Sequence, residues 1–180
     1  MRVITGKARG IVLKTPNGMA TRPTADRVKE ALFSIIQFDV PTAKVLDLFG
    51  GTGQLGIEAL SRDAASAVFV DEREDACKLI RENLKRTKLE QFARVIRSDY
   101  MAYLKTCKEK YDIILLDPPY AEVFLENSLK MITEIDILQS GGIIVTERPY
   151  GKELSWDFPG YTRSKDYKYG NTVITIFRKQ

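Results

Sequence analysis

The chain has 180 residues, of which 44% are hydrophobic and 29% are charged, and its net charge is +4. This size and composition fit one globular domain with a sizeable core, and no apolar run is long enough to span a membrane. The absence of histidine excludes Ser-His and Cys-His nucleophilic machinery and argues against a transition-metal centre. The first residues lack the long apolar stretch of a secretory signal, so we expect a cytoplasmic protein. Cys77 and Cys107 have no CxxC spacing, which predicts free buried thiols.

Positive charge is concentrated at the two ends of the chain. Residues 1–25 hold five basic side chains and no acidic one, residues 148–180 hold seven basic and three acidic ones, and residues 26–147 have a net charge of −5. Because phosphate contacts supply most of the non-specific affinity for nucleic acid, this division indicates a polyanion bound by the ends of the chain. Scattered Lys and Arg side chains that only solvate exposed strands are the alternative.

The sequence predicts two elements before the main body of the fold. Two short β-type runs, joined by a loop that carries Lys7 and Arg9, predict a basic N-terminal hairpin. Apolar side chains at helical spacing then predict a helix over residues 24–36. The expected parts of the domain are therefore a hairpin over 1–20, a helical segment over 21–40 and a core over 41–180.

The core is predicted from alternating strand-like and helix-like segments. In chain order these are strand 45–49, helix 54–62, strand 67–71, helix 73–87, strand 93–97, helix 100–107, strand 111–116, helix 122–136 and strand 142–147. Such alternation predicts an α/β fold with a mostly parallel sheet. Beyond Pro149, residues 160–167 and 172–178 predict an antiparallel hairpin at the sheet edge.

A glycine-rich turn after the first strand of the core predicts a site for a nucleotide-like cofactor. Gly51, Gly53 and Gly56 match the pattern GxGxxG, and Asp71 ends the next strand twenty residues after Gly51. A nicotinamide enzyme is therefore one interpretation. Against it, Asp47 places a carboxylate where a pyrophosphate would lie, and this carboxylate suits the ammonium group of a methionine. A tight turn that binds nothing is the structural alternative.

The tetrapeptide Asp117-Pro118-Pro119-Tyr120 directly follows a run typical of a buried strand. An exocyclic amine is a poor nucleophile while its lone pair is delocalised into the ring, so a methylating site must offer acceptors to both of its N–H groups. The Asp117 carboxylate and the Pro118 carbonyl are the candidates, and Tyr120 can stack on a base that has left its helix. This favours methyl transfer to a nucleobase, although a Pro-Pro turn that ends a strand would explain the same residues.

Three segments resemble one known family. Residues 22–33 start with Arg22-Pro23-Thr24-Ala25-Asp26-Arg27-Val28, residues 47–60 contain the glycine turn, and residues 117–120 are the proline tetrapeptide. Over nearly the full chain they resemble the RsmD family of bacterial methyltransferases. The resemblance implies S-adenosylmethionine-dependent methylation of a guanine exocyclic N2 in 16S RNA of the small ribosomal subunit. The implied fold is a Rossmann-like class I methyltransferase sheet with an N-terminal β-hairpin extension.

The resemblance also implies roles for single residues. The implied catalytic set is Asp117, Pro118 and Tyr120; the cofactor-binding set is Asp47, Phe49, Gly51, Gly53, Asp71 and Asp99; the nucleic-acid-binding set is Arg22, Thr24 and Arg27, to which the basic hairpin loop adds Lys7 and Arg9. Asp117 would orient the amine in line with the sulfonium methyl and stabilise the charge that develops. Asp71 would accept from the ribose hydroxyls and Asp99 from the adenine amine. Gln54 replaces a smaller residue that is commoner in the family, which leaves its own cofactor contact open.

The segment before the predicted helix admits a plainer reading. Arg22, Thr24, Asp26 and Arg27 precede its apolar stripe, so we expect them at the entrance to the site. A helix cap by Thr24 together with an exposed salt bridge is the alternative.

Two other functions stay open on the sequence alone. A DNA adenine-amine methyltransferase has almost the same chemistry, and the tetrapeptide does not distinguish an adenine amine from a guanine one. A non-catalytic RNA-binding assembly factor on the same fold is the second, although the intact tetrapeptide argues against it. The expected partner is 16S rRNA in the small subunit or in an assembly intermediate, without membrane or metal, and we expect a monomer.

Overall fold

The computed structural model describes residues 1–16, 23–119, 122–154, 156 and 158–180, apart from the side chains of residues 23–25 and 122. The strands are β1 Lys44–Asp47, β2 Ser66–Asp71, β3 Ala93–Arg97, β4 Tyr111–Leu116, β5 Leu138–Pro149, β6 Tyr161–Arg163, β7 Tyr167–Tyr169 and β8 Thr172–Lys179. The helices are α1 Pro23–Ile35, α2 Gln54–Ser61, α3 Glu74–Thr87, the 3₁₀ turn η1 Glu90–Phe92, α4 Tyr100–Thr106 and α5 Glu122–Ile135.

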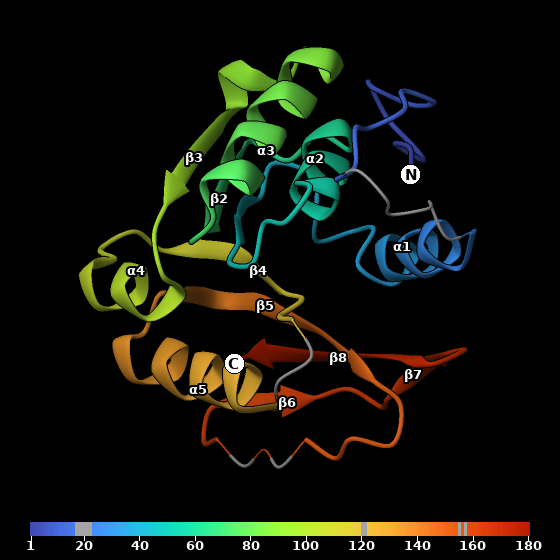
Figure 1. Ribbon diagram of the computed structural model, residues 1–180. Helices are drawn as coiled ribbons and strands as arrows, with labels where there is room; N and C mark the ends of the chain where they lie inside the picture. The colour runs from blue at the N-terminus through green and yellow to red at the C-terminus, as the bar shows by residue number, and fades with distance from the viewer. Residues whose placement is uncertain (17–22, 120–121, 155, 157) are drawn as a thin grey trace.

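These eight strands form one sheet in the order β3-β2-β1-β4-β5-β8-β6, with β7 also paired to β8 (Figure 1). Strands β1 to β5 pair in parallel, whereas β8 runs antiparallel to β5, β6 and β7. The predicted α/β class with an antiparallel C-terminal hairpin is confirmed. The chain order reverses between β1 and β4, and open parallel sheets bind their ligands beyond the carboxyl ends of the strands at such a point.

Two elements of the core differ from their predictions, while the other helices and strands from α1 onward begin and end within two residues of them. The strand expected over 142–147 begins earlier, because Leu138 pairs with Tyr111 before the ladder shifts register. The strand expected over 160–167 is split into β6 and β7. Between these two strands the Ser164 N–H still donates to the Ile176 carbonyl at 2.8 Å, but the Ile176 N–H donates to the Ser164 hydroxyl at 3.0 Å instead of to a backbone carbonyl, which interrupts the regular ladder.

The two faces of the sheet bury separate apolar cores. Helices α1, α2 and α3 cover the face that carries Val45 and Ile113, while α4 and α5 cover the face that carries Leu46 and Ile114. The helices on both sides of the sheet can be followed in Figure 1. Because successive residues of a strand point to opposite faces, the odd-numbered positions of β1, β4 and β5 face α1 to α3.

Residues 1–16 fold back on themselves beside α2. Within the described part of the chain, their strand-type pairing is a single antiparallel bridge between Arg2 and Val12, supported by a hydrogen bond from the Val3 N–H to the Ile11 carbonyl at 3.0 Å. The predicted hairpin is therefore an antiparallel pair of segments but not two regular strands. At Gly6 (φ +87°) an added Cβ would lie 1.7 Å from the Ser61 carbonyl oxygen, so this turn and α2 are in direct backbone contact.

A buried carboxylate fastens this segment to the core. Glu58 of α2 is fully buried and accepts the backbone N–H groups of Ile4 at 2.8 Å and Thr5 at 3.0 Å. It also pairs with the buried Lys29 of α1 at 3.4 Å and with Arg62 at 2.9 Å. Burial lowers the pKa of Lys29, and the Glu58 charge opposes that change. These bonds satisfy both charges away from water, so the N-terminal segment, α1 and α2 form one packed unit.

The structure also bears on the predicted thiols. Cys77 and Cys107 are both free, as predicted. Cys77 is buried on α3, but Cys107 is only half-buried, because it follows the last residue of α4 instead of lying inside the helix. In the part of the chain that the structure describes, no helix is both long and apolar enough to cross a membrane.

Candidate active site

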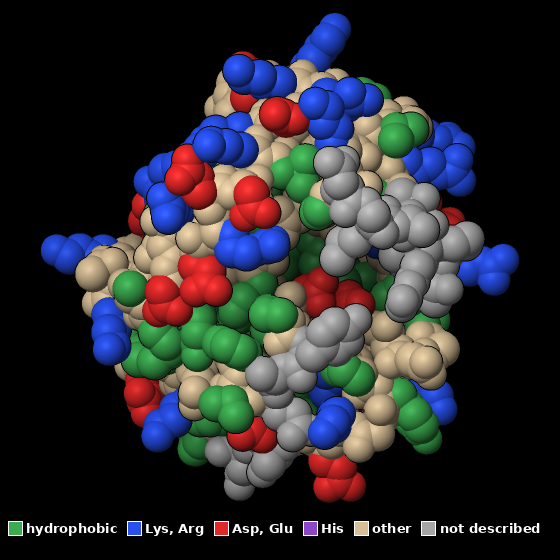
Figure 2. All heavy atoms as spheres, in the orientation of Figure 1, with side chains coloured by type: hydrophobic (Ala, Val, Ile, Leu, Met, Phe, Trp, Pro, Cys, Tyr) green, Lys and Arg blue, Asp and Glu red, His purple; other side chains and the backbone are tan. Residues whose placement is uncertain are grey.

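Three acidic side chains lie at the carboxyl ends of three neighbouring strands. Asp47 ends β1 opposite Leu115 of β4, and β4 pairs with β5 up to Thr146. Asp117 and Glu147 are the next residues on β4 and β5, and with Asp47 they share the odd positions that face α1 to α3. Figure 2 shows acidic side chains in a hollow near the middle of this view, over the ends of β4 and β5 in Figure 1. We call Asp47, Asp117 and Glu147 the carboxyl row.

The row is electrostatically unusual because it brings three carboxyl groups together, with Asp47 buried and Asp117 and Glu147 half-buried. The pKa of Asp47 is raised to about 7, chiefly by burial and also by the charges of Asp117 and Asp71, while a hydrogen bond from the Gly56 N–H at 3.1 Å opposes the rise. Burial raises the pKa of Asp117 to about 6. Burial and the Asp117 charge raise the pKa of Glu147 to about 8. A cationic or hydrogen-bond-donating ligand would therefore be favoured here.

The glycine turn borders one end of the row. Gly51 and Gly53 have φ values of +56° and +79°, in the left-handed region that favours glycine. The Gly51 N–H donates to the Asp71 carboxylate at 2.9 Å, which ties the turn to the end of β2. At Gly56 a Cβ would lie 2.3 Å from the Phe69 ring, so this position requires glycine for the close packing of α2 on the sheet. The turn is thus built for close approach of a ligand to its backbone.

An aromatic cluster lies beside the turn on the other side of the sheet. Phe49 and Tyr100 have ring centroids 5.3 Å apart, and Phe124 lies 5.5 Å from Tyr100 and 6.4 Å from Phe49. Asp99 caps α4 next to Tyr100, and its carboxylate accepts the Ala102 N–H at 3.0 Å. A flat, partly apolar wall beside a carboxylate is suited to a purine ring with an exocyclic amine.

Comparison with known proteins decides the family. Residues 1–178 match the family described as conserved hypothetical protein 95. The chain belongs to this family. It is 38% identical over 183 residues to YlbH of Bacillus subtilis, covering both chains completely. It is 34% identical over 180 residues to ribosomal RNA small subunit methyltransferase D of Escherichia coli, covering 100% of this chain and 90% of that protein.

Solved structures agree with this assignment. The Escherichia coli protein yhhF superimposes with a TM-score of 0.90 at 27% identity, over 100% of this chain and 98% of that one. The predicted family and the predicted enzyme class are confirmed, and the protein is a methyltransferase. The Rossmann-like class I methyltransferase fold expected from the sequence is confirmed as well.

Like Asp47, the predicted cofactor residues Asp71 and Asp99 already have structural partners. One oxygen of Asp71 accepts the Gly51 N–H, and the other accepts the Arg73 N–H at 3.0 Å and lies 3.5 Å from the Arg73 guanidinium. A carboxylate has about four lone-pair positions, so acceptor capacity remains on this group. Likewise, one carboxylate oxygen of Asp99 accepts the Ala102 N–H and caps α4, while the other oxygen has no partner among the described residues. Their predicted contacts with ribose and adenine stay predictions that this geometry permits.

Gln54 is the first residue of α2, next to Gly53 of the turn. Its side-chain oxygen Oε1 is buried and accepts no hydrogen bond from the described residues. A buried acceptor without a donor costs free energy unless a ligand or water satisfies it. The open question about Gln54 therefore becomes a specific prediction: its amide oxygen faces a donor on a bound ligand.

The predicted nucleic-acid-binding residues separate into three groups. Lys7 forms an exposed ion pair with Asp63 at 2.7 Å. Arg9 and Arg27 are exposed, on the N-terminal segment and on α1. The side chain of Thr24 lies outside the described part of the chain, and so do Arg22 and the predicted catalytic residue Tyr120. Of the alternative roles at the start of α1, the structure shows one exposed ion pair, between Arg2 and Asp26 at 3.7 Å.

The positive C-terminal region is largely committed to ion pairs within the protein. Arg148 is buried and donates to Asp166 at 2.5 Å and to the Thr175 hydroxyl at 2.7 Å. Arg163 also binds Asp166, at 3.1 Å, and Arg178 pairs with Asp39 at 2.9 Å. Much of the charge that suggested a polyanion contact at this end therefore stabilises the sheet edge.

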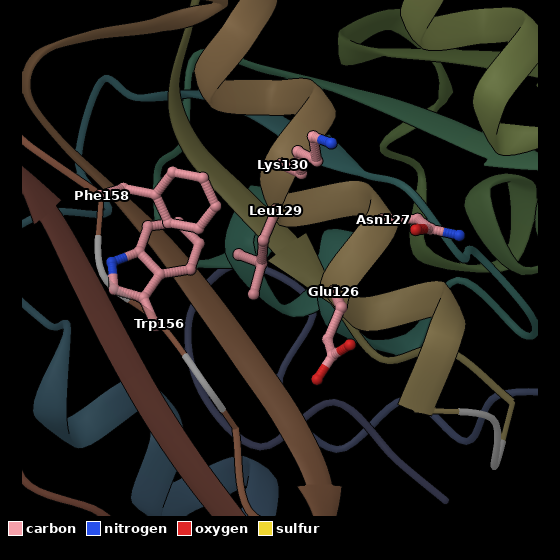
Figure 3. Close-up of a pocket in the computed structure, with 6 residues that line it drawn as sticks. All are labelled: Glu126, Asn127, Leu129, Lys130, Trp156 and Phe158. Carbon is pink, nitrogen blue, oxygen red and sulfur yellow. The ribbon is translucent and has the colours of Figure 1, made fainter.

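A cavity elsewhere on the surface has a different character. It measures about 260 Å³ and is lined by Glu126, Asn127, Leu129, Lys130, Trp156 and Phe158. Figure 3 shows Trp156 and Phe158 beside Leu129 of α5. Leu129 belongs to the core beneath α4 and α5, on the face opposite the carboxyl row. The cavity contains no residue of the row or of the glycine turn, so we assign no catalytic role to it.

Three residues of the site were not predicted from the sequence. Tyr100 and Phe124 lie at the starts of helices that follow strand ends, and Glu147 ends the apolar run of β5. An acidic residue at the end of a buried strand is the signal that would have identified Glu147, as it identified Asp47 and Asp71. Only the neighbouring position of β4 and β5 places it next to Asp117.

Proposed function

We propose that the protein transfers a methyl group from S-adenosylmethionine to the exocyclic N2 of a guanine in 16S RNA of the small ribosomal subunit. The carboxyl row beside a left-handed glycine turn is the observation that carries this proposal. It offers one carboxylate to the cofactor and another to the target amine, on adjacent strands. The name of the Escherichia coli relative, ribosomal RNA small subunit methyltransferase D, supports the substrate class.

The residues around the glycine turn fit S-adenosylmethionine. Asp47 is a buried carboxyl group with no cation paired to it in the described residues, and a methionine ammonium would supply the missing positive charge. Asp71 and Asp99 keep acceptor capacity for ribose hydroxyls and for the adenine amine, and Phe49 contributes an apolar surface for the ring. When bound, the cofactor supplies a methyl group on a positively charged sulfur.

Asp117 and Pro118 would hold the nucleophile. Accepting both N–H bonds of the amine leaves its lone pair free to point out of the plane of the base, toward the methyl group. The developing positive charge on nitrogen lies next to Asp117, so the carboxylate stabilises the transition state more than the bound substrate. We propose Tyr120 as the residue that stacks on the flipped base.

The N-terminal segment is proposed to bind RNA outside the chemical step. Arg9 and Arg27 are exposed cations on the side of the sheet that carries the row. Lys7 can exchange its exposed Asp63 partner for a phosphate at little cost, because exposed ion pairs contribute about 1 kcal/mol or less. Shape recognition of a folded particle would supply the remaining specificity.

The direct test is transfer of radiolabelled methyl groups to small-subunit particles from cells without this enzyme, followed by nucleoside analysis. We expect labelled N2-methylguanosine with the natural protein. Asp117→Ala should lower the rate by at least about a hundredfold while cofactor affinity and folding stay unchanged. Asp112→Ala, on the same strand but outside the row, is the matched control and should retain activity.

The alternatives give different results when the same assay is run with particles and, in parallel, with unmethylated DNA. Label in N6-methyladenine of DNA, with none in the particles, would replace the proposal with a DNA adenine methyltransferase. Binding of particles without any methyl transfer would point to a non-catalytic assembly factor. Near-normal turnover by Asp117→Ala would refute the role given to the carboxyl row.

A further inference from the structure

Glu147 is the member of the carboxyl row that has no role in the proposed methyl transfer. Asp47 faces the cofactor and Asp117 the amine, whereas Glu147 lies beyond Thr146, the last β5 residue paired with β4. Adjacent strands are about 4.8 Å apart, so its side chain projects beside that of Asp117 on the same face. Its register partner on the other side is Ile174 of β8, an apolar residue of the core.

The surroundings of Glu147 do not stabilise its charge. Glu147 is half-buried, and none of the described residues forms an ion pair or a hydrogen bond with its side chain. Burial and the neighbouring Asp117 both raise its pKa. A carboxyl group in such a position lowers the stability of the protein, whereas an apolar side chain of similar size would fit between Thr146 and Arg148 without that cost. This unfavourable placement indicates a contact with a ligand.

The edge of guanine provides the missing contact. Its N2 amine lies directly beside the ring N1–H, a second donor in the same plane. We propose that Glu147 is a specificity-determining residue, which accepts the N1–H of the target guanine while Asp117 and the Pro118 carbonyl hold the neighbouring N2 amine. This inference rests on the proposed function, because it assumes a guanine N2 as the methyl acceptor.

The contact explains how the site distinguishes two amines of similar chemistry. An adenine placed with its amine at Asp117 presents at N1 a lone pair and no N–H. When it is ionised, at a pH above its raised pKa of about 8, Glu147 would face that lone pair with a second acceptor, which is costly in a partly buried site. With guanine, the carboxyl group keeps an accepting oxygen whether or not it is protonated. On this proposal, Asp117 at the end of β4 and Glu147 on the adjacent strand β5 together select guanine over adenine.

The test compares two bases that carry the same amine. Small-subunit particles are rebuilt with either guanine or 2-aminopurine at the methylated position; 2-aminopurine keeps the C2 amine but has a lone pair at N1. At about pH 9, above the pKa of Glu147, we expect the natural protein to prefer guanine by about 30-fold or more in kcat/KM, the range for one specific hydrogen-bonded base contact. Glu147→Met should reduce this preference to about threefold or less, mainly by losing activity on guanine.

Two further variants separate recognition from folding. Glu147→Gln keeps an accepting oxygen and should retain more guanine activity than Glu147→Met, but its amide N–H can donate to N1 of 2-aminopurine, so its preference narrows as well. Glu134→Gln, an exposed carboxylate on α5, should leave the preference unchanged. If Glu147→Met does not fold, the ratio of kcat/KM for guanine to kcat/KM for 2-aminopurine in Glu147→Gln tests the same inference.

The possible failures are distinguishable. Equal loss of activity on both bases in the Glu147 variants, with the preference intact, would show a structural role and overturn the inference while the proposed function stands. Absence of any guanine methylation by the natural protein would overturn the proposed function itself, and the inference with it.

Discussion

Replacement of Asp47 by asparagine tests whether the carboxyl row lowers the stability of the free protein. Asp47 is buried, with 2% of its surface exposed, and its pKa rises from the ordinary value of 3.8 to about 7. Asparagine has nearly the same shape, and its amide oxygen can still accept the Gly56 N–H that Asp47 accepts at 3.1 Å. The variant therefore removes a buried charge with little change in packing.

The magnitude follows from the pKa shift. One pKa unit corresponds to about 1.4 kcal/mol, so a rise from 3.8 to about 7 means that ionised Asp47 destabilises the fold by about 4 kcal/mol. The folded protein binds this proton more tightly than the unfolded chain does. The fold is therefore more stable while Asp47 is protonated than after it has ionised. This stability is lost as the pH rises from about 4 to about 7, and Asp47 causes no further loss above pH 7.

Urea denaturation of the cofactor-free protein between pH 4 and pH 9 measures the effect. Near pH 4 the free energy of unfolding of Asp47→Asn should equal that of the natural protein. As the pH rises the variant should become the more stable of the two, by roughly 2–4 kcal/mol at pH 8. Glu134→Gln on the exposed face of α5 should show no such divergence. A less stable Asp47→Asn at pH 8 would refute the reasoning, because it would mean that the folded protein stabilises the charge.

The same variant should lose cofactor affinity. Asp47→Asn cannot neutralise an ammonium group, so we expect binding of S-adenosylmethionine to weaken by about tenfold or more at pH 8. In the natural protein the affinity should fall as the pH drops below about 7, since the ligand must then displace a proton from Asp47. Calorimetry at several pH values checks both expectations, and unchanged affinity in Asp47→Asn would remove this residue from the cofactor site.

Two further predictions concern the N-terminal segment. Charge reversal of Lys7 and Arg9 should weaken RNA binding by at least about tenfold, with cofactor affinity unchanged, and should reduce the slope of log affinity against log salt by the equivalent of about two phosphate contacts. The control Lys105→Glu on α4 should have little effect on RNA affinity. An equal loss of RNA affinity in both variants would mean that binding depends only on non-specific electrostatics. Gly6→Ala should lower the free energy of unfolding, measured by urea denaturation, by more than about 2 kcal/mol, because its Cβ would overlap the Ser61 carbonyl. Gly10→Ala has a similar φ of +82° but open space around its Cβ, so it should lower the free energy of unfolding by only about 1 kcal/mol. Equal costs would show that the turn moves freely away from α2.

The sequence predicted the elements of the core well because its signals are local. The apolar run of β4 ends at a proline tetrapeptide, and the glycine turn separates β1 from α2, so composition and period alone locate these boundaries. The N-terminal segment was harder to predict. Its bonds go to Glu58 and Ser61 of α2 rather than along a regular ladder, and no local pattern reports such partners.

The sequence by itself determined the order of strands and helices, the cofactor turn and the family, because each depends on residues that lie close together in the chain. Tertiary structure decided which strand ends are neighbours and which charges are buried. Asp117 and Glu147 are separated by a whole helix in sequence and meet only because β4 pairs with β5. Their protonation depends on burial, and the partner of Lys7 depends on packing. These quantities arise from contacts between distant segments, which a one-dimensional pattern does not contain.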